Sequence, residues 1–377
     1  MERMSEQEQF EFRALIRDGL ARVAPVETTR VLVARGCRGD EELRGRLVEL
    51  GLPGLVVADE HGGAGAGPQA LGILLEEAGR ALLPTAYFSS ATVVPFLLDR
   101  DRSGHAGEVL AALAAGTARV TFADVDERGA QPAVLADGPD GPTLTGAKTA
   151  VIDGDLATTA LVTATRADGS VVVAVDVSSP GVVIEHLRCL DETRPVVHMR
   201  FDGAAAVPLD IIDVDRVLHD ARALQRLALA AEAAGQIAAC LDLSVDYAKS
   251  RKQFGRAIGG FQAIKHRCAD MFVAAQASSA SVAAAFIAWD EHPDQRGLIA
   301  EAAASYCLQA GFDVAASTMQ IHGGIAFTAE GLPQLYLKRA KAAQLLAGGI
   351  DTEVARLAEE IFAPGRDPLA PILGAAS

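Results

Sequence analysis

The residue types best suited to chemistry follow one another in Arg251-Lys-Gln-Phe-Gly255. We expect a helix to end at Gly255, because glycine commonly follows a helix C-terminus. The guanidinium could hold a pyrophosphate through two hydrogen bonds, the amide a backbone or an adenine edge, and the ring a cofactor. A capped helix–turn–helix explains the spacing equally simply, and the spacing alone favours that structural interpretation.

Glycines gather in two further places. In Gln320-Ile-His-Gly323-Gly324 they indicate a turn between two helices. The loop Gly62–Gly67 has no G-x-G-x-x-G register and no surrounding βαβ pattern, so we expect a surface turn that leads into the next helix. The sequence also lacks a nucleophile elbow, a Walker lysine loop and histidines at metal-ligand spacing, and we predict no metal site.

Three stretches of different pattern must position these residues. Residues 1–118 read mostly as helix, 119–213 as β-branched runs separated by Asp-Gly and Pro-Gly turns, and 214–377 as helix again. We therefore predict an α+β multidomain fold with an N-terminal all-α domain, a middle β domain and a C-terminal helical bundle. The expected long helices cover 224–245, 261–290, 297–321 and 335–362.

Composition narrows the function classes. The chain has 377 residues and a net charge of −15, which argues against nucleic acid or an anionic membrane as partner. Five scattered cysteines exclude a standard structural zinc site and make a secreted disulfide framework a poor explanation. The first residues form no signal peptide, and no uncharged apolar run approaches the ~20 residues that span a bilayer. We expect a cytoplasmic soluble protein.

Three segments together resemble the acyl-CoA dehydrogenase family. They are Tyr247-Ala-Lys-Ser-Arg-Lys-Gln-Phe-Gly-Arg-Ala-Ile-Gly-Gly-Phe-Gln-Ala-Ile-Lys-His-Arg-Cys-Ala-Asp-Met271, Gln320-Ile-His-Gly-Gly-Ile-Ala-Phe327, and Gly62-Gly-Ala-Gly65 followed by Glu76-Glu-Ala-Gly-Arg80. The resemblance runs from about residue 10 to 362. It implies an N-terminal helical domain, a middle β-barrel domain and a C-terminal four-helix bundle. It also implies FAD as cofactor, an acyl-CoA substrate and an electron-transfer protein as acceptor.

The resemblance assigns roles to both candidate segments. In the family, the residues that match Arg251, Gln253 and Phe254 contact the ADP half of an FAD held mainly by a neighbouring subunit. The residues that match Gln320, Gly323 and Gly324 do the same. Phe261, Gln262 and Asp270-Met271 match positions that pack the helical domain, so we interpret them as structural.

The position of the family's catalytic base is altered. The family removes an α-proton from an acyl-CoA thioester while the β-hydride passes to flavin, which requires a carboxylate beside the α-carbon. The usual glutamate precedes Gly-Thr in the last domain, and Ala347 stands there; a second site used by some members falls on Gln225. Glu232 lies two turns further along, within Ala230-Ala-Glu-Ala-Ala234. It could be a buried base of raised pKa, or it could pair with a charge across the bundle.

The contacts to the flavin ring are altered as well. The family's Thr-Glu-Pro…Gly-Ser-Asp segment is replaced by Thr121-Phe-Ala-Asp-Val-Asp-Glu-Arg-Gly129. After Gly146-Ala-Lys148, which matches the family, Ala150 and Ile152 stand where an aromatic residue and a threonine line the ring. Gly349 likewise replaces the threonine after the missing glutamate. The residues that reach a neighbour's ADP are thus kept, while the base and the contacts to the chain's own ring are lost.

Three functions agree with this selective loss. The first is an acyl-CoA dehydrogenase subunit that completes the FAD site of a catalytic partner, in a homo- or hetero-oligomer. Such pairs occur among bacterial enzymes that handle bulky acyl-CoAs such as steroid side chains. The second is a self-sufficient acyl-CoA dehydrogenase with Glu232 as its base. The third is a non-redox protein that binds CoA esters or supports assembly without flavin.

Overall fold

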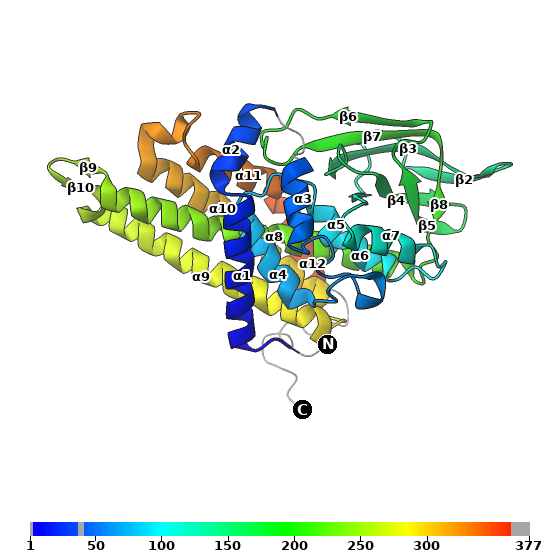
Figure 1. Ribbon diagram of the computed structural model, residues 1–377, viewed down its shortest axis with the longest axis horizontal. Helices are drawn as coiled ribbons and strands as arrows, with labels where there is room; N and C mark the ends of the chain where they lie inside the picture. The colour runs from blue at the N-terminus through cyan, green and yellow to red at the C-terminus, as the bar shows by residue number, and fades with distance from the viewer. Residues whose placement is uncertain (1–2, 37–40, 363–377) are drawn as a thin grey trace. The chain divides into compact units, whose positions relative to one another are not determined.

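The computed structural model describes residues 3–36 and 41–362 (Figure 1). These residues form two compact units, each assembled from separate stretches of the chain. The first unit combines the residues up to 30, 68–83 and the residues from 226 onward. The second combines the described residues of 31–67 with 84–225.

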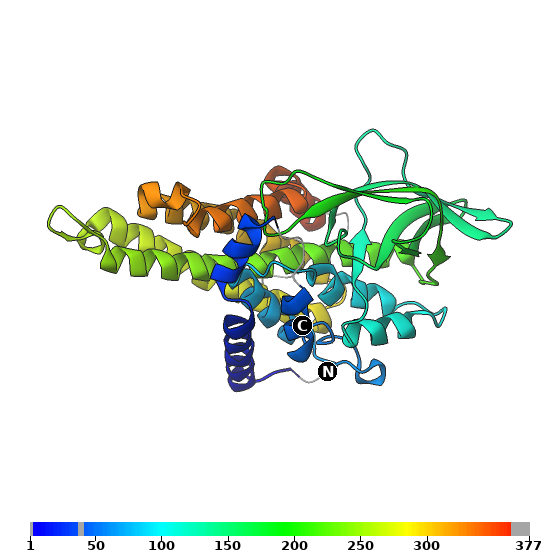
Figure 2. The ribbon, with the colours of Figure 1, turned by 45° about the horizontal axis from the view of Figure 1, so that its top comes forward.

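The first unit is helical. Its elements are α1 Glu6–Val23, α4 Pro68–Arg80, the part of α8 Val214–Ser250 that follows residue 225, α9 Gln262–Glu291, η2 Ile258–Gly260, α10 Arg296–His322, η3 Gly323–Phe327, α11 Pro333–Leu346 and α12 Ile350–Ile361. Figures 1 and 2 show α8 and α9 running side by side in opposite directions, joined by a small hairpin at one end. Leu82, Ile237, Met271, Val314 and Tyr336 are among the buried residues of its core.

Ion pairs hold α1 against α4. Ser5 caps the N-terminus of α1 and exchanges hydrogen bonds with Glu8 in a capping box. Further along, Arg13 lies 2.9 Å from the Glu76 carboxylate and Arg17 lies 2.8 Å from the Glu77 carboxylate. Both glutamates are buried in α4. Buried carboxylates are found where a cation compensates them, and α1 supplies that cation twice.

Two glycines let α4 and α8 cross in close contact. A Cβ added to Gly79 would lie 2.2 Å from the backbone oxygen of Glu232, and one added to Gly235 would lie 1.7 Å from that of Glu76. No real Cβ tolerates such distances. The crossing therefore requires glycine on both helices.

The expected single helix over 335–362 is wrong. Helix α11 ends at Leu346 and α12 begins at Ile350. Between them Gly348 and Gly349 have φ values of 108° and 90°, which lie outside the helical region. The two adjacent glycines break the helix where the apolar pattern continues.

The second unit combines short helices with a sheet. Its helices are α3 Glu41–Glu49, η1 Asp59–His61, α5 Phe88–Ala91, α6 Val93–Leu98 and α7 Ala106–Ala114. Helix α2 Val26–Ala34 begins in the first unit and ends in the second. Its strands are β1 Val120–Ala123, β2 Val134–Gly138, β3 Gly141–Ile152, β4 Thr159–Arg166, β5 Gly169–Asp176, β6 Val182–His186, β7 Val196–Ala205 and β8 Val207–Pro208. The strand order is β6-β7-β3-β2-β4-β5-β8, with β1 paired to β4. The middle β domain is confirmed.

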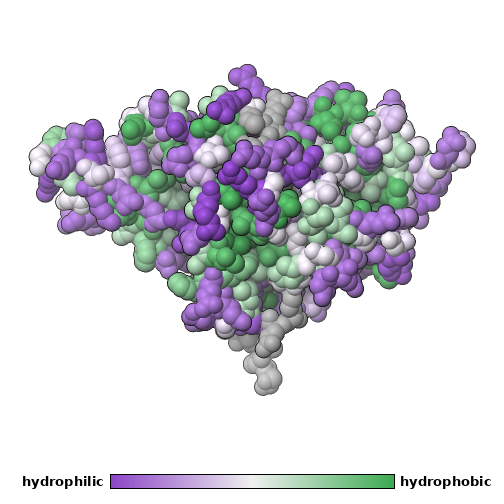
Figure 3. All heavy atoms as spheres, in the orientation of Figure 1, coloured by the Kyte–Doolittle hydropathy of each residue, from purple (hydrophilic) through white to green (hydrophobic). Residues whose placement is uncertain are grey.

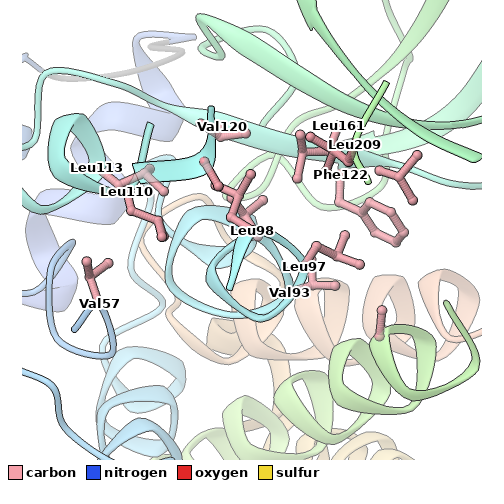
Figure 4. Close-up of a cluster of buried hydrophobic side chains, with 14 of the residues drawn as sticks. Val57, Val93, Leu97, Leu98, Leu110, Leu113, Val120, Phe122, Leu161 and Leu209 are labelled. Atoms are coloured by element: carbon pink, nitrogen blue, oxygen red, sulfur yellow. The ribbon is translucent and has the colours of Figure 1, made fainter. Parts of the chain in front are cut away.

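Apolar side chains fill this unit from both helices and strands. Figure 4 shows Leu97 and Leu98 of α6, Leu110 of α7 and Phe122 of β1 in one buried cluster with Leu161 of β4. A second cluster lies within the sheet and includes Val162, Val173 and Met199. The β-branched residues of these strands thus pack in the core of the sheet, as their pattern in the sequence indicates.

Two helices are long and apolar enough to cross a membrane by length and composition. In α8 the relevant window is 72% buried inside the protein, and in α9 it is 39% buried. Core helices of globular proteins pass the same test, so the length is weak evidence for a membrane span.

Candidate functional site

The segment 251–257 forms a small hairpin rather than a helix end. Helix α8 ends at Ser250, not at Gly255 as expected, and β9 Lys252–Gln253 pairs with β10 Arg256–Ala257. Phe254 and Gly255 form the two-residue turn with φ values of 52° and 78°. Positive φ at both turn residues is typical of hairpins whose twist matches their strands. The structure thus holds a non-glycine residue in a conformation that such residues rarely adopt.

The hairpin presents its functional side chains to solvent. Phe254 is 91% exposed, and Arg251 and Gln253 are exposed as well. Figure 3 shows hydrophilic side chains gathered at this end of the first unit. Phe261, interpreted from sequence as structural, supports the hairpin: its ring lies 6.1 Å from that of Phe254 and 4.1 Å from the Arg256 guanidinium.

The second segment begins inside a helix. Gln320 lies in the last turn of α10, so it belongs to the helix rather than to a loop, and Gly323 and Gly324 open η3. Gly323 has a φ of 62° and a ψ of −138°, which only glycine adopts readily. All three residues are exposed, and a Cβ at either glycine would meet nothing within 4 Å. The backbone is therefore open to a ligand.

An aromatic stack brings these two segments together. The rings of Tyr247 and His322 lie 4.4 Å apart at an interplanar angle of 22°. Tyr247 precedes Arg251 by one helical turn, and His322 directly precedes Gly323. An arginine, an amide, an exposed ring and bare glycine backbone consequently share one end of the first unit. This donor set fits the ADP half of a dinucleotide.

The positions examined for a base hold no free carboxylate. Ala347 is buried at the C-terminus of α11, where Arg356 donates a hydrogen bond to its carbonyl oxygen. Gln225 is half-buried on α8. Glu232 is 1% exposed, and its carboxylate lies 3.9 Å from the guanidinium of Arg339 on α11. The expected burial of Glu232 is confirmed, and the charge across the bundle is Arg339.

The segment expected to face a flavin ring is filled with ion pairs that sequence reasoning missed. Arg222 donates to both carboxylate oxygens of Asp124, at 2.8 and 2.7 Å. Lys148, almost fully buried in β3, donates to the Asp126 carboxylate at 2.6 Å and to Thr163 at 2.9 Å. The hydrogen bonds that Arg222 donates to the Asp124 carboxylate raise the pKa of Arg222 above its ordinary value. A lysine within an apolar strand was the one available signal.

The end of β3 that was expected to face a flavin ring carries apolar side chains at residues 150 and 152. Ala150 has a φ of 54°, and Ile152 is buried. The carbonyl oxygen of Ile152 accepts a hydrogen bond from the Thr121 hydroxyl at 2.6 Å. Both side chains offer bulk but no hydrogen bond.

A groove of about 470 Å³ lies in the first unit. It is lined by residues of α9, α10 and α12, among them Met271, Tyr306, Val314 and Val354. None of the predicted site residues lines it. Met271 is buried, whereas Gln262 and Asp270, which were interpreted with it as structural, are exposed.

Comparison with known proteins identifies the family. Residues 6–100 match the model of the acyl-CoA dehydrogenase N-terminal domain, and residues 216–362 match that of the C-terminal domain. Acyl-CoA dehydrogenase IpdE2 of Mycolicibacterium smegmatis is 32% identical over 93% of this chain and 99% of its own length. Acyl-CoA dehydrogenase FadE34 of Mycobacterium tuberculosis is 36% identical over 80% of this chain, which spans only 40% of that protein.

Solved structures agree. The Tcur3481-Tcur3483 steroid acyl-CoA dehydrogenase variant has a TM-score of 0.85 at 28% identity, covering 94% of this chain and 98% of its own. The ChsE4-ChsE5 complex from Mycobacterium tuberculosis has a TM-score of 0.87 at 24% identity, covering 96% and 99%, which shows the fold. The N-terminal helical, middle β and C-terminal helical order is thus confirmed. The chain belongs to the acyl-CoA dehydrogenase family, flavin-dependent oxidoreductases that act on CH–CH groups.

Proposed function

We propose that this chain is an acyl-CoA dehydrogenase subunit that completes the FAD site of a second family member, which supplies the base. The observation that carries the proposal is a contrast within the chain. The residues that would reach a neighbour's ADP are exposed to solvent. In the segment expected to face the flavin ring, Asp124 and Asp126 are instead bound to Arg222 and Lys148.

The ring-facing segment gives the chain little with which to hold its own flavin. When bound, FAD accepts the hydride from the β-carbon. FAD is anionic, and the carboxylates of Asp124 and Asp126 would place further negative charge beside it. Arg222 and Lys148, which could otherwise bind the cofactor, are already paired with these two carboxylates. Arg251, Gln253 and Phe254 face solvent instead, free to bind the ADP half in a neighbouring subunit.

A base is also missing. Ala347 cannot take a proton, and Gln225 carries an uncharged amide. Glu232 lies two helical turns from Gln225 on α8, and its carboxylate lies 3.9 Å from the guanidinium of Arg339. These contacts favour a structural role for Glu232, and a partner subunit with the usual glutamate accounts for the reaction.

The relatives point to the kind of partner. Two of the similar structures are named as pairs of proteins, Tcur3481-Tcur3483 and ChsE4-ChsE5, and the first is called a steroid acyl-CoA dehydrogenase. We infer a hetero-oligomer in the cytoplasm that acts on a bulky acyl-CoA. Its electrons would pass to an electron-transfer protein.

Flavin content tests the proposal. The chain is purified alone and after co-expression with a family member from the same genome that carries the glutamate, and flavin is counted from the visible spectrum. We expect none in the chain alone and one FAD per pair in the complex. Arg251→Ala should lower that count, while Arg222→Ala, which removes an arginine of the ring-facing segment, should leave it at one.

Two outcomes would contradict the proposal. One flavin per isolated chain, with activity that Glu232→Gln abolishes, would establish the self-sufficient enzyme. Colourless protein in every pairing, with retained binding of a CoA ester, would establish the non-redox function.

A further inference from the structure

The two ADP-binding segments come from different helices, so something must fix the distance between them. The hairpin follows α8 and the glycine segment follows α10. An arginine on one segment and glycine backbone on the other can meet one ADP group only if both helix ends keep a constant separation. The Tyr247–His322 stack lies at the base of both.

Each ring of the stack is tied to its own segment. The carbonyl oxygen of Tyr247 accepts a hydrogen bond from the backbone N–H of Arg251 at 2.8 Å. His322 is bonded covalently to Gly323, whose N–H donates back to Met319. The backbone of each stacked residue is therefore joined directly to the segment that follows it.

The imidazole has one fixed orientation. Its Nδ1 lies 2.9 Å from the carbonyl oxygen of Thr318. Because a carbonyl oxygen only accepts, Nδ1 carries the proton and donates it. Burial lowers the pKa of His322 below its ordinary value of 6.5, so the ring that stacks on Tyr247 is neutral at pH 7.

Helices α8 and α10 also contact each other before the stack. The Thr318 hydroxyl lies 3.3 Å from the Ser244 hydroxyl and 3.4 Å from the carbonyl oxygen of Cys240, so α8 and α10 are joined one turn earlier. The stack extends this connection to one helical turn before Arg251 on α8 and to the residue before Gly323 on α10. Beyond it, Phe254, Gly323 and Gly324 are exposed.

We propose that Tyr247 and His322 are positioning residues for the ADP group, which hold segments 251–255 and 320–324 at the separation that one ADP requires. This inference rests on the proposed function. The two rings act together, because one ring without the other forms no stack and no longer connects the two segments. Loss of one should therefore cost as much as loss of both.

The test is FAD titration into the flavin-stripped complex of this chain and its partner. We expect Tyr247→Leu and His322→Leu each to raise the dissociation constant about five- to tenfold, the range that an aromatic pair supports. The double variant should bind no more weakly than either single variant. Tyr247→Phe keeps the stacked ring and should bind as the unaltered complex does.

Phe312→Leu is the matched control. Phe312 is a half-buried ring of α10 that lies under Lys341 of α11, 5.4 Å away, outside both segments. Its loss should lower the melting temperature to a similar extent without changing the dissociation constant of FAD. A general weakening of the bundle would instead affect all three leucine variants alike.

The outcomes separate the two levels of the argument. An unaltered complex that binds no FAD would overturn the proposed function and this inference with it. An unaltered complex that binds FAD, with unchanged affinity in both leucine variants, would overturn only the positioning role. Independent, multiplying effects of the two substitutions, or an equal effect of Phe312→Leu, would overturn it as well.

Discussion

Glu232 shows how one residue type can suggest chemistry from sequence and packing from structure. Its alanine-rich surroundings correctly indicated burial, which is one condition for a carboxylate of unusual basicity. The sequence could not show that Arg339, more than a hundred positions away, lies 3.9 Å from it. Helix periodicity places both residues on inward faces but does not say which inward residues meet.

The pair should couple strongly in stability. Removing one member of a buried ion pair typically costs about 3–5 kcal/mol, whereas replacing both with neutral residues is often nearly neutral. We expect Arg339→Met to lower the free energy of unfolding by about that amount. Glu232→Gln combined with Arg339→Met should recover most of the loss in chemical denaturation.

The same variants separate structure from catalysis. If Glu232 only pairs with Arg339, the assembled complex that carries both substitutions should turn over acyl-CoA at close to the normal rate. A rate that collapses in a folded, flavin-loaded double variant would assign the base to Glu232.

Glu76 illustrates a charge whose burial changes its titration. Burial raises the pKa of Glu76 above its ordinary value of 4.5, and the Arg13 guanidinium opposes that shift. A raised folded-state pKa means that the folded chain holds this proton more tightly than the unfolded chain. Its contribution to stability is therefore complete below pH 4.5 and is lost as the pH rises through the folded-state pKa.

We expect Glu76→Gln to flatten the fall in unfolding free energy between pH 4.5 and the higher folded-state pKa. Glu8 provides a control of opposite sign, since hydrogen bonds from Ser5 lower the pKa of that exposed carboxyl. Its contribution is lost as the pH falls, so Glu8→Gln should alter only the acid limb. Urea denaturation across this pH range measures both, and an unchanged slope in Glu76→Gln would refute the assignment.

At the scale of elements, the crossing of α4 and α8 depends on backbone contact. Gly79 and Gly235 have no room for a methyl group, because the facing carbonyl oxygens lie 2.2 and 1.7 Å from where a Cβ would be. Neither helix can retreat without exposing the buried residues around the crossing. Gly79 belongs to the segment Glu76-Glu-Ala-Gly-Arg80, so part of the family resemblance here reflects packing rather than cofactor binding.

Alanine should therefore lower the free energy of unfolding at Gly79 and Gly235 and raise it at Gly45. Gly79→Ala and Gly235→Ala overpack the crossing, and each should lower the unfolding free energy by about 1–3 kcal/mol or more. Gly45→Ala lies on α3, where a Cβ would meet nothing within 4 Å. There the better helix propensity of alanine should stabilise the chain by about 0.5–1 kcal/mol. Calorimetry or denaturant titration would compare the three variants.

Element types were predictable from the sequence where the pattern is long, and element ends were not. The period of 3.6 from Leu224 to Val245 gave α8, and the β-branched runs gave β4, β5 and β7. Two adjacent glycines, Gly348 and Gly349, marked the break between α11 and α12 in the sequence. The apolar pattern continued across them, so the sequence predicted one helix. The hairpin at 252–257 left no signal, because its strands are two residues long and Phe254 is not a usual turn residue.

At the scale of the whole chain, the order helical, β-rich, helical was sufficient to predict the fold class. The division at residues 118 and 213 stays a prediction. What the sequence could not supply were pairings across long separations, such as Asp124 with Arg222, 98 positions apart. The family residues missing from this part of the chain predict a changed ring site, which stays a prediction, and the structure shows the ion pairs of Asp124 and Asp126 there.

If this chain works in the proposed hetero-oligomer, the exposed ring of Phe254 would affect how the cell handles an unassembled copy. With Phe254, Ile325 and Phe327 facing water, the lone chain displays apolar side chains at one end. Chaperones and proteases act on such surfaces, and docking against a second subunit would cover them. Turnover of the orphan would then adjust the amounts of the two polypeptides to one another after translation, and neither gene would need to be expressed in strict proportion.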